Sequence, residues 1–171
     1  EPLFETGAAI VIGVNTTTPF LHKRGIVTDA QIRRVEQLAQ DNSARKSVLV
    51  VAHHPFHVLD PADQGQLVEN HEAAIRAWSA AGVDLILGGH IHVPYVYPLI
   101  QRYPDLANPM LVVQGGTTTS LRVRRHIPNS LNVIDLYPEK KIHITTWTYQ
   151  PRDGSHPNRF MCVEKDLCKT S

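Results

Sequence analysis

The sequence has few cysteines and no long apolar run, and each shortage excludes a class of protein. Only two cysteines occur in 171 residues, Cys162 and Cys168, both within the last ten. Secreted domains held together by disulfides carry more, so we expect reduced thiols and a cytoplasmic location, with a small disulfide-closed loop as the alternative. No apolar run approaches the roughly 20 residues of a membrane-spanning helix, and we expect no membrane contact.

Charge of one sign is also in short supply. The formal net charge is +1 with neutral histidines, and the basic cluster at Arg122–Arg125 ("RVRR") is very short. Domains that bind nucleic acid usually carry a larger basic patch, so we expect no nucleic-acid partner. Histidine, by contrast, is abundant: the chain has ten, and several crowd into two short stretches, residues 48–57 and 85–96.

Apolar runs in the first half of the chain predict three strands. The run at residues 8–15 is rich in β-branched residues, which favour strands. The runs at 47–52 and 83–88 are apolar at successive positions, as a central parallel strand buried on both faces requires. Two prolines and a glycine in residues 53–66 indicate a surface loop between them.

Two amphipathic helices are expected between these strands. The first spans residues 28–42, because Thr28 and Gln31 have the spacing of a capping box. The second spans residues 70–82, with Asn70 as its N-cap and Gly82 as its left-handed stop. The residues expected on the buried faces are Ile32, Val35, Leu38, Ala39, Ile75 and Trp78.

The second half of the chain predicts a run of antiparallel strands. Its candidate strands are residues 109–116, 119–125, 130–137 and 141–150. We therefore expect one α/β domain over residues 1–149, followed by an irregular C-terminal tail over residues 150–171.

Histidines follow two of the strands that one helix connects. His53 comes directly after the run at 47–52, and His90 follows the run at 83–88. A single crossover helix makes these strands parallel and places them side by side, about 4.8 Å apart. Ligands of α/β sheets bind beyond the carboxyl ends of the strands, so we expect both histidines at one site.

His92 extends this pair if the backbone is extended there. Residues i and i+2 of an extended chain point to the same side, about 6.5 Å apart. Imidazole nitrogens bind first-row metals at about 2.0–2.1 Å, so His53, His90 and His92 are candidate ligands of one ion or of two adjacent ions. Gly88 and Gly89 would let the chain turn and leave room for metal and substrate. A histidine pair on a surface strand is the alternative reading of each motif taken alone.

Two other histidines near this site, His54 and His57, are not expected to bind a metal. Pro55 argues against a helical ligand pair formed by His53 and His57, so His57 is expected to be a loop residue. His54 is either a loop residue or a contact to substrate.

The two histidine-containing stretches resemble motifs of a known protein family. The stretches "VLVVAHHPF" (48–56) and "LILGGHIHVP" (85–94) resemble the last two motifs of the calcineurin-like metallophosphoesterases. Residues 25–38 and 112–136 are similar to the branch of that family that contains cyclic-nucleotide phosphodiesterases. Together the resemblance covers about residues 10–149.

The resemblance implies a fold and a chemistry. It implies that the chain is the C-terminal half of a four-layer α/β/β/α sandwich that holds two divalent or trivalent ions of Mn, Fe or Zn. By the same resemblance, His53 and His90 share one metal and His92 binds the other. The implied reaction is hydrolysis of a phosphoester by hydroxide formed at the two metals.

The resemblance also has a gap. The earlier family motifs, Asp-x-His, Gly-Asp and Gly-Asn-His-Asp/Glu, supply a bridging aspartate and a general acid, and they are absent from this sequence. Asp60, Asp63 and Asp84 are in a loop or at the wrong end of a strand to replace them. We therefore expect little activity from this chain alone. We expect the chain to be bound to a missing N-terminal half, to self-associate through exposed sheet edges, or to be poorly stable.

The substrate and the competing functions stay open at this point. A small phosphoester, with cyclic nucleotide as the first candidate, would contact Thr117 and Arg122 in addition to His54. The catalytic acid is not identified. One alternative is a catalytically inactive, degenerate domain that serves binding or assembly. Another is an unrelated zinc hydrolase with three histidine ligands, which would need a nearby carboxylate base.

Overall fold

The computed structural model describes residues 2–19, 24–152 and 154–169, with side chains described as far as Cys162. The strands are β1 (Leu3–Glu5), β2 (Ala9–Val14), β3 (Ser47–Ala52), β4 (Leu85–Gly88), β5 (Tyr95–Pro98), β6 (Leu111–Gln114), β7 (Ser130–Leu136), β8 (Ile142–Gln150) and β9 (Arg159–Lys169). The helices are α1 (Asp29–Asn42), α2 (His71–Ala81) and the short 3-10 helices η1 (Pro61–Gln66), η2 (Leu99–Gln101) and η3 (Pro138–Lys140).

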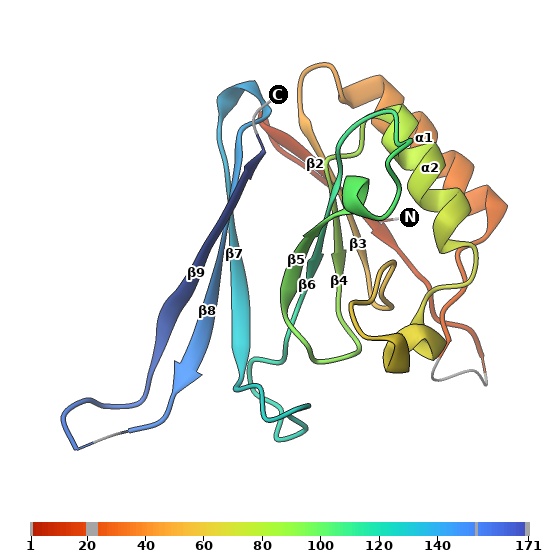
Figure 1. Cartoon of the computed structure of the whole chain (residues 1–171). Helices are drawn as coiled ribbons and strands as arrows, with labels where there is room; N and C mark the ends of the chain where they lie inside the picture. The colour runs from red at the N-terminus through yellow and green to blue at the C-terminus, as the bar shows by residue number, and fades with distance from the viewer. Residues whose placement is uncertain (1, 20–23, 153, 170–171) are drawn as a thin grey trace.

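Six strands form a mixed sheet in the order β1-β2-β3-β4-β6-β5. Strands β2, β3, β4 and β6 are parallel, whereas β1 and β5 pair antiparallel at the two edges. Helices α1 and α2 cover one face of this sheet, and the sheet β7-β8-β9 lies on its other side (Figure 1). The expectation of an α/β fold is confirmed, and the described residues form three layers: helices, mixed sheet and antiparallel sheet.

The two helices begin in different ways. At α1 the expected capping box is present: the Thr28 hydroxyl accepts from the backbone N–H of Gln31, and the Gln31 side chain accepts from the backbone N–H of Thr28. Asn70 stands at the N-cap of α2 but makes no capping hydrogen bond, because its φ is 65° and its side chain donates to the Val27 carbonyl instead. Gly82 ends α2 with φ of 90°, as expected.

Within the described residues, no helix combines the length and apolar character that crossing a membrane requires.

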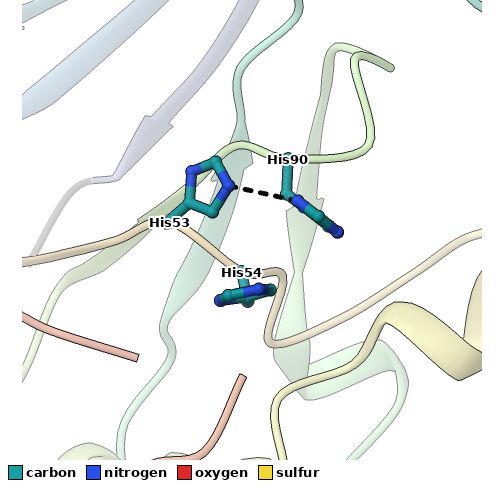
Figure 2. A group of neighbouring side chains, drawn as sticks. All are labelled: His53, His54 and His90. Atoms are coloured by element: carbon teal, nitrogen blue, oxygen red, sulfur yellow. Dashed lines mark hydrogen bonds between the residues drawn. The ribbon is translucent and has the colours of Figure 1, made fainter. Parts of the chain in front are cut away.

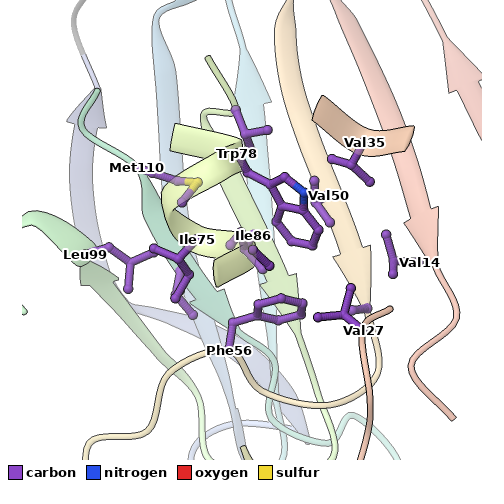
Figure 3. Packing of buried hydrophobic residues seen from close by; sticks show 14 of the residues in the cluster. Val14, Val27, Val35, Val50, Phe56, Ile75, Trp78, Ile86, Leu99 and Met110 are labelled. Atoms are coloured by element: carbon purple, nitrogen blue, oxygen red, sulfur yellow. The ribbon is translucent and has the colours of Figure 1, made fainter. Parts of the chain in front are cut away.

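The main core lies between the helices and the mixed sheet. Trp78 of α2 is fully buried, its ring centroid is 5.1 Å from that of Phe56, and its indole N–H donates to the Ile32 carbonyl of α1. Val14, Val35, Val50 and Ile86 belong to the same cluster, as Figure 3 shows. All six residues expected on the inner helix faces are buried.

A smaller core joins the two sheets. Ile142 and Ile144 of β8 are fully buried and belong to one cluster with Leu49, Leu85 and Leu111 of the mixed sheet. The sheets therefore pack face to face through apolar side chains.

Three sequence expectations for the second half are wrong. Strand β6 lies within the run that is expected to be antiparallel, but it pairs parallel with β4. Residues 119–125 form no strand: Leu121 is 98% exposed, and none of the described strands pairs with this segment. The chain beyond residue 150 is not wholly irregular, because β9 pairs antiparallel with β8. The domain boundary at residue 149 and the reduced state of Cys168 stay predictions.

Candidate metal centre

The candidate site lies at the carboxyl ends of β3 and β4. The two strands are parallel neighbours, with Val51 of β3 opposite Leu87 of β4. His53 follows the last residue of β3, and the backbone N–H of Gly89 donates to the His53 carbonyl over 3.0 Å. That hydrogen bond continues the pairing of the two strands and carries the chain directly to His90. The expected meeting of His53 and His90 is confirmed.

Three imidazole rings converge at this point (Figure 2). His53, His54 and His90 each offer a nitrogen, and these nitrogens all lie within 4.8 Å of one another. His53 Nε2 is 3.1 Å from His90 Nδ1. Ring-centroid distances are 4.9 Å for His53–His90, 5.0 Å for His53–His54 and 4.6 Å for His54–His90. We call these three residues the histidine group.

The geometry of the histidine group fits a metal ion. Two nitrogens 3.1 Å apart can both lie about 2.0–2.1 Å from one ion at an N–metal–N angle of about 100°, between the octahedral and tetrahedral values. Imidazole suits zinc, iron and other transition metals. No carboxylate joins the histidine group within the part of the chain that the structure describes.

His54 is the buried member of the histidine group. Its ring is 2% exposed, and its Nδ1 lies 2.9 Å from the Thr16 hydroxyl. Its Nε2 is buried and has no hydrogen-bond partner among the residues that the structure describes. Burial, and to a lesser extent the charges that His90 and His53 would carry, lower the pKa of His54 from 6.5 to about 4. The ring is therefore neutral at pH 7 and keeps one unused lone pair or N–H inside the protein.

His90 is also held in its neutral form. Burial lowers its pKa, and the neighbouring His53, His92 and Arg124 lower it further. A neutral imidazole is the form that binds a metal. The site therefore does not have to give up bound protons at neutral pH before His54 and His90 can act as ligands.

The turn after β4 differs from the expected extended chain. His90 has φ of 71° and His92 has φ of 56°, and the N–H of Ile91 donates to the Gly89 carbonyl. Ile91 is 2% exposed and packs in the main core. Because the chain turns to bury Ile91, the two histidines do not point to one side as residues i and i+2 of a strand.

The structure therefore does not place His92 in the histidine group. Its Nδ1 lies 2.7 Å from the Arg122 carbonyl. Residue 88 is glycine because of packing rather than because of the expected turn: a Cβ there would fall 2.6 Å from the Gln114 side-chain oxygen. The left-handed positions of this turn are occupied by the histidines rather than by the glycines.

The residues expected to touch substrate lie on the segment between β6 and β7. Thr117 uses its hydroxyl to accept from the Ser120 N–H, and the Arg122 side chain is exposed. The two following arginines are tied down instead: Arg124 and Arg125 bind the Asp63 carboxylate at 3.1 and 2.8 Å. Arg124 also donates to the Ile91 carbonyl over 3.4 Å, which holds the segment against the turn that carries His90.

Sequence reasoning missed two features of the site. His54 was given no role as a metal ligand, although the alternation Val48, Val50, Ala52 along β3 puts residue 54 on the buried helix side. Gln66, whose side-chain oxygen lies 2.9 Å from His90 Nε2, gave no signal. Its place in the site depends on how η1 folds back over the strand ends.

Comparisons with known proteins give little further information. The sequence matches no model of a known protein family and no curated protein. Among solved structures, it is similar to a Staphylococcus aureus protein provisionally named a 5'-nucleotidase, crystallised with alpha-ketoglutarate. The TM-score is 0.40 at 16% identity, over 94% of this chain and 28% of that chain. This chain thus spans less than a third of the length of that protein, and a TM-score this low does not establish a shared fold.

Proposed function

We propose that this chain is the histidine-bearing part of a metal-dependent phosphoester hydrolase of the calcineurin-like type. The observation that carries the proposal is the 3.1 Å approach of His53 Nε2 to His90 Nδ1 at the carboxyl ends of two neighbouring parallel strands. The motifs around these two histidines are the ones that resemble that family. The fourth layer of the sandwich, a second set of helices, is part of the same proposal.

Each residue of the site has a role in this proposal. His53 and His90 hold one ion through the two facing nitrogens, with His54 Nε2 as a third donor. His92 holds the second ion through Nε2, since its Nδ1 is directed at the Arg122 carbonyl. When bound, the two ions supply a water nucleophile at neutral pH and neutralise the charge that develops at the phosphorus.

The remaining ligands must come from elsewhere. A two-metal site holds its ions about 3.5–4 Å apart and needs a bridging oxygen ligand, for which a carboxylate is the usual group. We propose that a further segment of the protein, or a partner chain, provides it. The exposed strand β1 at the sheet edge, with Phe4 66% exposed, offers one surface for such an association.

The proposed substrate is a small phosphodiester, such as a cyclic nucleotide. Thr117 and Arg122 lie on the segment that Arg124 holds against the His90 turn, so they are candidates for contacts with phosphate. The burial of His54 favours its role as a metal ligand over the expected contact with substrate.

A catalytically inactive domain that keeps the fold for binding or assembly is the second candidate. The observation that favours it is the lack of a carboxylate in the histidine group within the described residues. Such a domain would bind one metal weakly and turn over no phosphoester.

Metal binding and turnover separate the candidates. We would measure bound Zn, Mn and Fe after equilibrium dialysis, and hydrolysis of bis-p-nitrophenyl phosphate, for this chain and for the chain extended by any upstream coding sequence. The control variant is His126→Ala, since His126 is exposed and outside the histidine group.

We expect His90→Ala to weaken metal binding by more than the roughly 100-fold that loss of an outer ligand partner costs, and His126→Ala to leave it unchanged. Turnover by the extended form alone would support the hydrolase. Metal binding by either form with no turnover favours the inactive domain. If neither form binds metal and His90→Ala changes nothing, the metal site itself is wrong.

A further inference from the structure

The short helix η1 lies over the strand ends and directs one side chain at the histidine group. We propose that Gln66, its last residue, is a positioning residue that decides which nitrogen of His90 is offered to a metal. The inference rests on the proposed metal site, and it assigns a role to a residue with no place in the motifs that suggested that site.

Gln66 Oε1 lies 2.9 Å from His90 Nε2. A carboxamide oxygen only accepts hydrogen bonds, so Nε2 must carry the proton of the neutral ring. The lone pair is then at Nδ1, which is the nitrogen that faces His53 Nε2 over 3.1 Å. Gln66 thus selects the tautomer in which His90 presents its lone pair toward His53.

This arrangement has a general counterpart in metal proteins. A ligating histidine usually donates its other ring N–H to a protein acceptor, which fixes the tautomer and the ring orientation. Loss of such an acceptor typically lowers metal affinity 10- to 100-fold. For His90, φ of 71° already restricts where the ring can point, and the hydrogen bond that Nε2–H donates to Gln66 also fixes the rotation of the ring.

The helix that carries Gln66 is itself held firmly. Its first turn is capped by Asp60, whose side chain accepts from the Ala62 N–H over 2.8 Å. Asp63, 3% exposed, is bound by Arg124 and Arg125. After the helix, the Val68 N–H donates to the Pro55 carbonyl over 3.0 Å. Gln66 is therefore presented from a backbone that is fixed on both sides, which reduces the entropy lost when its side chain binds His90.

Gln64 provides a matched control. It belongs to the same helix and has the same side chain, but it is exposed and lines the surface hollows beside Leu67 and His71 rather than the histidine group. Gln66→Leu and Gln64→Leu therefore make the same chemical change two residues apart. Gln66→Glu keeps an acceptor oxygen beside His90 and serves as the rescue.

Two measurements on these variants test the inference. The tautomer of His90 is read from ¹⁵N shifts of the imidazole nitrogens in the metal-free chain, and zinc affinity is measured by chelator competition. We expect Nε2–H in wild type, Gln64→Leu and Gln66→Glu, but a mixture in Gln66→Leu. We expect zinc affinity to fall 10- to 100-fold in Gln66→Leu alone, with thermal unfolding similar in the two leucine variants.

The possible results separate this inference from the proposed function. If wild type binds zinc and Gln66→Leu binds it equally well, the inference is overturned and the metal site stands. A proton on Nδ1 in wild type also overturns the inference, because Gln66 would then present its amide nitrogen to His90. If wild type binds no zinc but His90 keeps a Gln66-dependent tautomer, the metal function fails while the positioning of His90 by Gln66 is supported.

Discussion

Asp84 and His54, which are buried at opposite ends of the same parallel strands, differ in their hydrogen-bond partners. At the amino ends, the Asp84 carboxylate is 1% exposed and accepts from the Val48 N–H at 2.9 Å, with the Lys140 ammonium 3.0 Å away. At the carboxyl ends, His54 is almost as deeply buried, yet no group in the described part of the chain forms a hydrogen bond with its Nε2. A buried polar group normally has a partner, so the Asp84 carboxylate contributes to stability, whereas Nε2 of His54 stays available for the ligand role proposed above.

The largest effect is expected from breaking the amino end. Asp84→Ala removes the acceptor of the Val48 N–H, which is buried, and the partner of Lys140. We expect the free energy of unfolding to fall by about 3 kcal/mol, with zinc affinity unchanged. Urea unfolding and chelator competition measure the two quantities.

The control for this change is Asp135→Ala. Asp135 is exposed and lies 3.7 Å from His143, so its loss should cost no more than about 0.5 kcal/mol. Equal losses of stability in the two variants would contradict the difference between the ends of the sheet.

A smaller effect is expected from acid at the carboxyl end. The pKa of His54 is about 4 in the folded chain and 6.5 when exposed, so the unfolded state takes up a proton first as the pH falls. The cost of keeping His54 neutral is therefore absent above pH 6.5 and lowers the free energy of unfolding as the pH falls toward 4, by about 3 kcal/mol.

This window is checked by urea unfolding of the metal-free chain between pH 7.5 and 4 in steps of about half a unit. His54→Gln has no group that titrates there, so its stability should decline less steeply than that of wild type. Parallel pH profiles for the two chains would contradict the buried neutral state of His54.

The smallest effect is expected from Asp63→Asn. This change weakens the ion pairs with Arg124 and Arg125, whose side chains are 45% and 40% exposed and can turn to water. We expect a loss of about 1 kcal/mol, with faster amide exchange confined to residues 121–126. Asp105→Asn, which alters an exposed pair with Arg76, is the control and should not change that exchange.

Local signals predicted much of the fold. The capping box at Thr28 and Gln31 depends on residues three apart, and the apolar runs of β3 and β4 depend on burial on both faces. The crossover through α2 then made these strands parallel neighbours, which brought His53 and His90 together. Each step used only neighbouring residues and a general rule of topology.

Interactions between distant residues could not be predicted in this way. The bond of His54 to Thr16 joins residues 38 apart, and the pairs of Asp63 with Arg124 and Arg125 span more than 60. Residues 119–125, which contain Arg122, Arg124 and Arg125, are predicted to be a strand because their local pattern alternates. This segment is held as a loop by a carboxylate that nothing nearby in the sequence indicates.

His92 shows how a local assumption fails. Its expected direction required an extended backbone, but burial of Ile91 in the core outweighed the cost of two left-handed histidines. Ile91 is the apolar residue of "GGHIH" (88–92), and burial of its side chain favours a turn over an extended chain.

Gly25 has a consequence for the site although it carries no polar side chain. A Cβ at residue 25 would fall 2.5 Å from His54 Nδ1 and 2.9 Å from the His54 Cβ. A single methyl group at residue 25 would displace the His54 imidazole from Thr16. The strands and the rings of His53 and His90 could keep their places. The position of the His54 ring therefore depends on the absence of a side chain at residue 25, which is far from His54 in the sequence.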